Sequence, residues 1–176
     1  MKYLYTRSDD GTLLRLARWN EEGTRDILIV HGLAEHLERY QHVGQFLAER
    51  GWRVTAVELR GHGESEGKRG HTIHWHRYLE DVQAAMGTIQ KPMAIIGHSM
   101  GGLITLWSLM YPLTPKVRCI AISNPLLGLF TTPPRLKVFL GKIASRIVPS
   151  LSIPNDLNPS IDARHVPTPY PLPHSQ

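Results

Sequence analysis

The sequence predicts an α/β fold with a mostly parallel sheet and helices on both of its faces. Two patterns indicate this class. Short continuous apolar runs, typical of strands buried on both sides of a parallel sheet, alternate with longer segments whose apolar residues recur at helical spacing. This alternation continues without an internal sequence repeat, which favours parallel strands joined by helices. A length of 176 residues, 41% of them apolar, is sufficient for one packed domain.

The expected elements follow one another along the chain. Residues 1–20 are expected to form two strands around the turn Asp9-Asp10-Gly11, and Trp19 closes the second strand. Gly51 is expected to end the first helix, because glycine adopts the left-handed conformation that commonly follows a helix. Further strands are expected at 27–30, 54–59, 92–96 and 117–123, and helices at 37–50, 75–89 and 99–110.

The pattern changes after residue 124. Residues 133–148 have the apolar spacing of one amphipathic helix. The last stretch carries a proline at every second position from Pro167 to Pro173, a density that excludes both a helix and a central strand. We therefore expect residues 160–176 to form an extended, disordered tail.

The segment Gly97-His98-Ser99-Met100-Gly101 matches the pattern Gly-x-Ser-x-Gly of a nucleophile elbow. It lies between a predicted strand and a predicted helix, as an elbow requires. The sharp turn lifts the serine hydroxyl above the sheet edge, and the helix N-terminus behind it favours developing negative charge. Ser99 is therefore the predicted catalytic nucleophile, with Gly97, His98 and Gly101 as supporting residues.

A second segment, His31-Gly32-Leu33, follows directly after the strand expected at 27–30. In folds with a nucleophile elbow, one oxyanion donor is the backbone N–H of the residue after the nucleophile, and the other comes from this earlier loop. The predicted oxyanion hole therefore consists of the amides of Leu33 and Met100, with His31 and Gly32 as supporting residues.

Three motifs in order resemble the monoacylglycerol lipases and lysophospholipases among the S33-type α/β-hydrolases. The string HGLAEHLERY at 31–40 looks like their HGxxEHxxRY signature, GHGESEG at 61–67 resembles a second signature, and GHSMGG at 97–102 a third. The resemblance covers roughly residues 1–159. Glu58 departs from the aspartate that this family usually carries before the Arg-Gly-His-Gly loop, and we expect it to alter hydrogen bonding in that loop rather than the chemistry.

The resemblance implies a hydrolase of lipid esters that forms an acyl-enzyme on its serine and needs neither cofactor nor metal. It also implies that residues 1–123 are the N-terminal part of the α/β-hydrolase core and that residues 124–159 begin a helical cap over the acyl-binding pocket. The apolar face of 136–148 could line an acyl tunnel, touch a lipid surface, or pack on the core.

The family places its catalytic Asp and His on two further strands after the cap, and little chain follows Pro159 here. Asp162 with His165 and Asp156 with His174 have the right order, but neither pair can occupy two separate strand ends. We therefore expect the triad Asp and His to be absent and activity to be impaired or lost. The break in composition near Pro159 suggests a truncated or frameshifted product of low stability, because losing the last strands exposes a sheet edge.

Other histidines have structural interpretations. His98 is expected to point away from the serine hydroxyl, and His31 and His62 to organise the floor of the site. The cluster His71, His74 and His76 lacks accompanying cysteines or carboxylates at ligand spacing, so no metal site is expected.

Composition and charge narrow the functional classes to which the protein can belong. The net charge of +5 comes from scattered residues without a nucleic-acid motif, so nucleic-acid binding is not expected. With no signal peptide and no apolar run long enough to span a membrane, we expect a soluble cytoplasmic protein, its oligomeric state left open. Cys119 lies in an apolar run and is expected to be a buried structural thiol. Two alternatives to the lipid esterase remain: a proline-specific peptidase and a non-catalytic fragment that binds apolar ligands.

Overall fold

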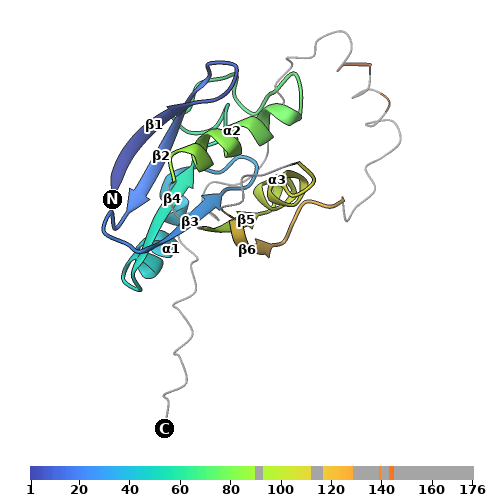
Figure 1. Ribbon diagram of the computed structural model, residues 1–176. Helices are drawn as coiled ribbons and strands as arrows, with labels where there is room; N and C mark the ends of the chain where they lie inside the picture. The colour runs from blue at the N-terminus through green and yellow to red at the C-terminus, as the bar shows by residue number, and fades with distance from the viewer. Residues whose placement is uncertain (90–92, 112–116, 129–138, 140–142, 145–176) are drawn as a thin grey trace. The chain divides into compact units, whose positions relative to one another are not determined.

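Six strands form one sheet in the computed structural model, which describes residues 1–89, 93–111, 117–128, 139 and 143–144. The strand order is β1-β2-β4-β3-β5-β6 (Figure 1). The strands are β1 (Lys2–Arg7), β2 (Leu13–Trp19), β3 (Arg25–Val30), β4 (Trp52–Val57), β5 (Met93–His98) and β6 (Val117–Ser123). The chain divides into two compact units, Met1–Pro133 and Pro134–Gln176, and the whole sheet belongs to the first.

The sheet is mostly parallel, as predicted. Strands β3, β4, β5 and β6 run parallel, so that Leu28 of β3 lies opposite Thr55 of β4 and Ile95 of β5. Strand β1 pairs with β2 in the antiparallel sense, and β2 pairs with β4 in the same sense. The carboxyl ends of β3, β4 and β5 therefore meet at one edge, where ligand sites of such sheets lie.

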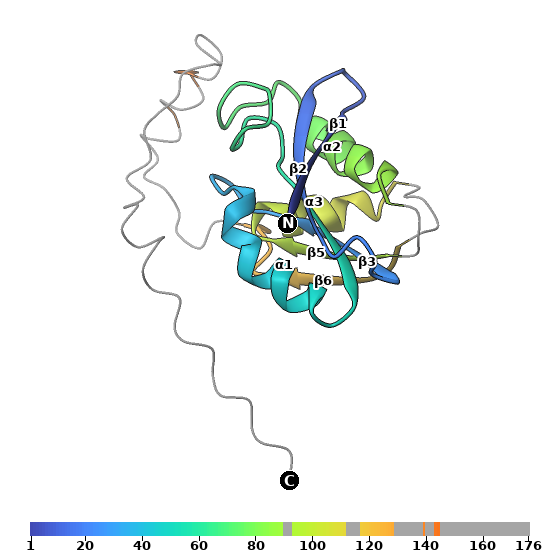
Figure 2. The ribbon, with the colours of Figure 1, turned by 90° about the vertical axis from the view of Figure 1, so that its left-hand side faces the viewer.

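Helices cover both faces of this sheet (Figures 1 and 2). They are the 3-10 helix η1 (Leu37–Tyr40), α1 (Gln41–Ala48), α2 (His76–Gly87) and α3 (Met100–Ser108). Successive strand residues point to opposite faces, so Leu28 packs in the cluster under α2 and α3, whereas Ile27 and Ile29 pack in the cluster under α1. The prediction of helices on both faces is confirmed.

The helix expected at 37–50 is divided in two. Tyr40, with φ −97° and ψ 6°, separates η1 from α1. The backbone N–H of Leu37 at the start of η1 donates to the Glu58 carboxylate, an acceptor far away in sequence. Gly51, with φ +82°, ends the segment in the left-handed conformation that was expected.

The prediction of a buried Cys119 is wrong. The thiol is exposed, because β6 is the last strand of the described sheet and pairs only with β5 there. An apolar run indicates a buried strand only where both faces of the sheet are covered, and every residue of β6 is exposed or half-buried.

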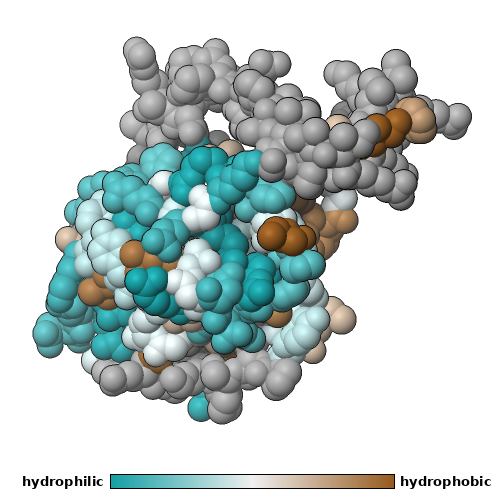
Figure 3. Space-filling model, turned by 90° about the horizontal axis from the view of Figure 1, so that it is seen from above, coloured by the Kyte–Doolittle hydropathy of each residue, from teal (hydrophilic) through white to brown (hydrophobic). Residues whose placement is uncertain are grey.

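Several predictions fall outside the described residues. Of the amphipathic helix expected at 133–148, only Phe139, Ile143 and Ala144 are described, each in a helical conformation, and the tail at 160–176 lies entirely outside. No helix in the described ranges is long and apolar enough to cross a membrane. Seen from above, the surface is mostly hydrophilic with separate hydrophobic residues (Figure 3).

Candidate active site

Ser99 occupies a strained turn between β5 and α3. Its φ of 51° and ψ of −116° lie outside the conformations that residues with a side chain normally adopt. The backbone holds it there: its N–H donates to the Ser123 carbonyl at 2.9 Å, and its carbonyl accepts from Leu103 at 3.1 Å and Leu126 at 3.0 Å. The side chain is half-buried, and no hydrogen bond to its hydroxyl is formed within the described part of the chain. This is the geometry expected of a nucleophile elbow.

The glycines of the elbow are required by close packing. A Cβ on Gly97 would lie 2.6 Å from Thr105 Oγ1, and one on Gly101 would lie 2.2 Å from the carbonyl oxygen of Val30. Real Cβ atoms do not approach that closely, so any side chain would force the main chain apart. The Gly-x-Ser-x-Gly spacing is thus explained by contacts of α3 with β5 and with the end of β3.

The loop after β3 lies against Ser99. A Cβ on Gly32 would be 3.1 Å from the Cβ of Ser99, which places the predicted oxyanion loop beside the predicted nucleophile. Among the described residues, the backbone N–H groups of Leu33 and Met100 have no hydrogen-bond partner. These two amides therefore remain free to bind an anionic oxygen.

Glu35 fixes this loop. Its carboxylate accepts hydrogen bonds from the Gly32 amide at 2.7 Å and the Tyr40 hydroxyl at 2.7 Å, and it pairs with Arg39 at 3.3 Å. Burial acts to raise the pKa of Glu35, but the bonds from Tyr40 and Gly32 outweigh it and lower the pKa, so the carboxylate stays ionised. Sequence reasoning used the HGxxEHxxRY string only as a family signature and missed this role.

His31 joins the ends of two strands. Its Nε2 accepts a hydrogen bond from the Leu59 amide at 3.0 Å, so Nδ1 carries the proton and donates to the Gly32 carbonyl at 2.6 Å. Burial lowers the pKa of His31 to about 4. The ring is neutral with both nitrogens engaged, so it cannot act as a general base.

The other two motif histidines are also held by neighbours. His62 lies with its ring 5.0 Å from that of His31 and donates from Nδ1 to the Arg60 carbonyl at 2.9 Å; burial lowers its pKa. His98 lies with Nδ1 3.2 Å from Ser123 Oγ and Nε2 4.0 Å from Glu35. In the described part of the chain, no histidine forms a hydrogen bond with the Ser99 hydroxyl.

A buried ion pair organises the loop that follows β4. Glu58 is fully buried and accepts two hydrogen bonds from Arg15, at 2.8 and 3.0 Å. It also accepts from the amides of Leu37 at 3.1 Å and Glu64 at 2.7 Å. Gly63 has φ +45°, and a Cβ there would lie 1.9 Å from Glu58 Oε1. Glu58 thus joins Arg15 to the backbone of two loops, and the expectation that its replacement of aspartate leaves the chemistry unchanged stays a prediction.

The cluster His71, His74 and His76 contains one stacked pair of rings. His74 and His76 stack with ring centroids 5.4 Å apart. The described residues contain no group of three or more His, Cys, Asp or Glu side chains that could hold a metal ion.

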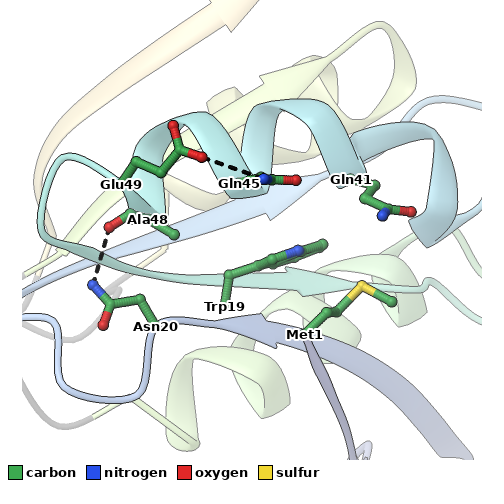
Figure 4. A pocket seen from close by; sticks show the side chains of 7 residues that line it. All are labelled: Met1, Trp19, Asn20, Gln41, Gln45, Ala48 and Glu49. Atoms are coloured by element: carbon green, nitrogen blue, oxygen red, sulfur yellow. Dashed lines mark hydrogen bonds between the residues drawn. The ribbon is translucent and has the colours of Figure 1, made fainter.

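A pocket of about 390 Å³ lies where α1 packs against β2 and the N-terminus (Figure 4). Its polar groups largely satisfy one another: Asn20 donates to the Ala48 carbonyl at 3.1 Å, and Gln45 to Glu49 at 3.2 Å. None of its residues belongs to the loops around Ser99. The lining residues are Met1, Trp19, Asn20, Gln41, Gln45, Ala48 and Glu49.

The comparisons with known proteins agree with this geometry. Residues 22–166 match the sequence profile of the serine aminopeptidase S33 family. The chain is 32% identical over 151 residues to a monoglyceride lipase of Rattus norvegicus, covering 82% of this chain and 50% of the relative. It is 30% identical over 135 residues to a monoacylglycerol lipase of Mycolicibacterium smegmatis, covering 73% of this chain and 48% of the relative.

A solved structure leads to the same family. The crystal structure of the monoacylglycerol lipase of Paleococcus ferrophilus superimposes with a TM-score of 0.70 at 32% identity, covering 84% of this chain and 56% of that one. The chain therefore spans about half the length of these three relatives. It belongs to the serine aminopeptidase S33 family of α/β-hydrolases, with monoacylglycerol lipases among its relatives.

Proposed function

We propose that this chain carries the nucleophile of a carboxylic-ester hydrolase that acts on monoacylglycerols or lysophospholipids through an acyl-enzyme on Ser99. The observation that carries the proposal is the strained conformation of Ser99 between β5 and α3, beside Gly32. A strained residue held by three backbone hydrogen bonds is typical of a functional site.

The proposed reaction needs no cofactor. Ser99 Oγ attacks the ester carbonyl while its proton passes to a base, and the amides of Leu33 and Met100 stabilise the oxyanion. Collapse of the intermediate leaves the acyl group on Ser99 and releases the alcohol. Water then hydrolyses the acyl-enzyme.

We propose further that this chain performs the reaction slowly, because no histidine of the described residues is hydrogen-bonded to Ser99 as a base. His31 uses both ring nitrogens in hydrogen bonds, and His98 lies beside Ser123. His62 donates from Nδ1 to the Arg60 carbonyl, and its buried Nε2 has no hydrogen-bond partner, the Ser99 hydroxyl included. The candidate pairs Asp156 with His174 and Asp162 with His165 lie outside the described residues. Loss of a triad member leaves only about 10³- to 10⁴-fold catalysis over water, from the oxyanion hole and binding.

The names of the relatives support the substrate class. Two relatives are monoglyceride or monoacylglycerol lipases and a third, from Bacillus subtilis, is named phospholipase YtpA. The test is release of fatty acid from a monoacylglycerol by the purified chain and by Ser99→Ala. Slow release that the variant abolishes is expected; equal release by both would refute the proposal.

A second candidate is a proline-specific peptidase, which the description of the matching family favours. A proline-specific peptidase would cleave a prolyl amide faster than a monoacylglycerol, and this cleavage would also depend on Ser99. Binding of a monoacylglycerol without any turnover of either substrate would instead favour a non-catalytic fragment.

A further inference from the structure

Positive φ angles gather around Ser99. Among the described residues, four residues other than glycine have a positive φ, and three of them, Ala34, Ser99 and Asn124, follow β3, β5 and β6. These strands are neighbours in the sheet, with β5 in the middle. Residues with a side chain keep this conformation only where the surrounding structure determines it, and they cluster at functional sites. The loops after β3 and β6 therefore flank the predicted nucleophile on its two sides.

The chain after β6 holds Asn124 beside Ser99. His98 lies opposite Ser123 in the register of β5 with β6. The residues that follow them, Ser99 and Asn124, are therefore neighbours at the carboxyl ends of the two strands. The backbone N–H of Ser99 donates to the Ser123 carbonyl at 2.9 Å, and its carbonyl accepts from the Leu126 amide at 3.0 Å. These two bonds hold the chain on both sides of Asn124 against Ser99, so an ester that reacts with Ser99 lies next to Asn124.

The Asn124 side chain is unpaired in the described part of the chain. It is exposed, and its carboxamide forms no hydrogen bond with another described residue. Two polar neighbours are already engaged: His98 Nδ1 lies 3.2 Å from Ser123 Oγ, and Glu35 accepts from a backbone amide and a tyrosine hydroxyl, each at 2.7 Å. A carboxamide donates and accepts hydrogen bonds and carries no charge, so it suits a hydroxyl group better than a carboxylate or an ammonium group.

The loop on the other side of Ser99 presents an apolar side chain. Leu33, in the loop after β3, is 53% exposed. Because β5 lies between β3 and β6, the loops that carry Leu33 and Asn124 are on opposite sides of the nucleophile. An ester of a fatty acid with a hydroxyl-bearing alcohol has one apolar part and one polar part, which these two side chains match.

We propose that Asn124 binds a hydroxyl group in the alcohol part of the ester and thereby selects glycerol esters over esters of alcohols without a further hydroxyl group. This inference rests on the proposed esterase function and adds to it the residue that recognises the alcohol. The carboxamide donates to the oxygen of the substrate hydroxyl or accepts its proton. A site that binds a substrate hydroxyl disfavours an analogue without it, because the polar group of the protein then loses its partner.

Hydrolysis rates of a short-chain monoacylglycerol and of the ethyl ester of the same fatty acid test the proposal. The disrupting variant is Asn124→Gly, because glycine adopts a positive φ without strain and the change removes only the carboxamide. Its matched control is Asn20→Gly, at another asparagine with a positive φ, 53°, which lies before β3 begins and so at the far end of that strand from Ser99. Circular dichroism establishes that each variant is folded.

The measured quantity is the ratio of the monoacylglycerol rate to the ethyl ester rate. The wild type and Asn20→Gly are expected to share one ratio, and Asn124→Gly to lower it about fivefold or more, the loss expected for one hydrogen bond. An unchanged ratio in Asn124→Gly, or an equal fall in Asn20→Gly, would overturn the inference.

A second measurement needs no turnover. In Ser99→Ala protein, the nuclear magnetic resonance signals of the Asn124 side-chain amide are expected to shift when the monoacylglycerol is added and not when the ethyl ester is added. Equal response to both esters, or to neither, would overturn the inference. A shift with the monoacylglycerol alone, in a chain whose wild type shows no Ser99-dependent hydrolysis, would support the role of Asn124 in binding and refute the proposed esterase function.

Discussion

Replacing Arg15 by methionine removes the guanidinium that pairs with Glu58. The two side chains are 5% and 0% exposed, so the remaining carboxylate would be buried without its counter-charge. The amides of Leu37 and Glu64 would still donate to it, but two amides do not replace a bidentate cation. Breaking a buried pair by removing one partner costs about 3–5 kcal/mol of the free energy of unfolding.

The matched control is Lys2→Met, which breaks the pair with Glu21. Those side chains are 60% and 51% exposed, so the expected loss is only about 0–1 kcal/mol. Urea unfolding of the wild type and both variants, followed by circular dichroism, gives the loss in free energy of unfolding for each variant. An Arg15→Met loss below about 1 kcal/mol, equal to that of the control, would refute the reasoning that Glu58 depends on Arg15.

Three further predictions follow from the same geometry. Gly101→Ala should lower the free energy of unfolding by about 2 kcal/mol or more, because its Cβ would lie 2.2 Å from the Val30 carbonyl oxygen; a loss near zero in urea unfolding would contradict this. Glu35→Gln should speed hydrogen exchange of the Gly32 amide by about tenfold, since a charged acceptor is replaced by a neutral one; unchanged exchange would show that Glu35 does not hold the loop. His31 has a pKa of about 4 when folded, below its unfolded value, so its contribution of about 3 kcal/mol is complete above pH 6.5 and is lost as the pH falls towards 4. His31→Gln should flatten that part of the stability profile, and identical profiles would contradict the assignment.

The parts of the fold that follow from local periodicity could be predicted. The strands around Leu28 and Ile95 are buried on both faces, and the helix after Ser99 begins directly behind it, because apolar runs and glycine spacing report these features. Cys119 shows the limit of this reasoning. A residue's own neighbours in sequence do not reveal whether its strand is central or at an edge, which depends on strand order.

The candidate site also has features that the sequence predicted and features that it did not. Ser99 and Gly32 were identified from motifs, and the structure places them side by side. The bonds of Glu35 and Glu58 were not predicted, because they join residues across loops whose conformation is irregular. Hydrogen bonds between such loops depend on tertiary placement, on which hydrophobic periodicity carries no information.

The central claim is that Ser99 is the nucleophile, and the proposed slow turnover adds that no histidine of the described residues is placed as its base. The most direct measurement is mass-spectrometric mapping of a fluorophosphonate probe on the folded chain over time, with Ser99→Ala as control. The account predicts slow modification, at Ser99 ahead of every other hydroxyl and about 10³-fold or more slower than in a complete serine hydrolase. Modification spread over other side chains, or none at Ser99, would contradict the assignment of the nucleophile. Complete labelling within minutes would instead refute the proposal of slow turnover.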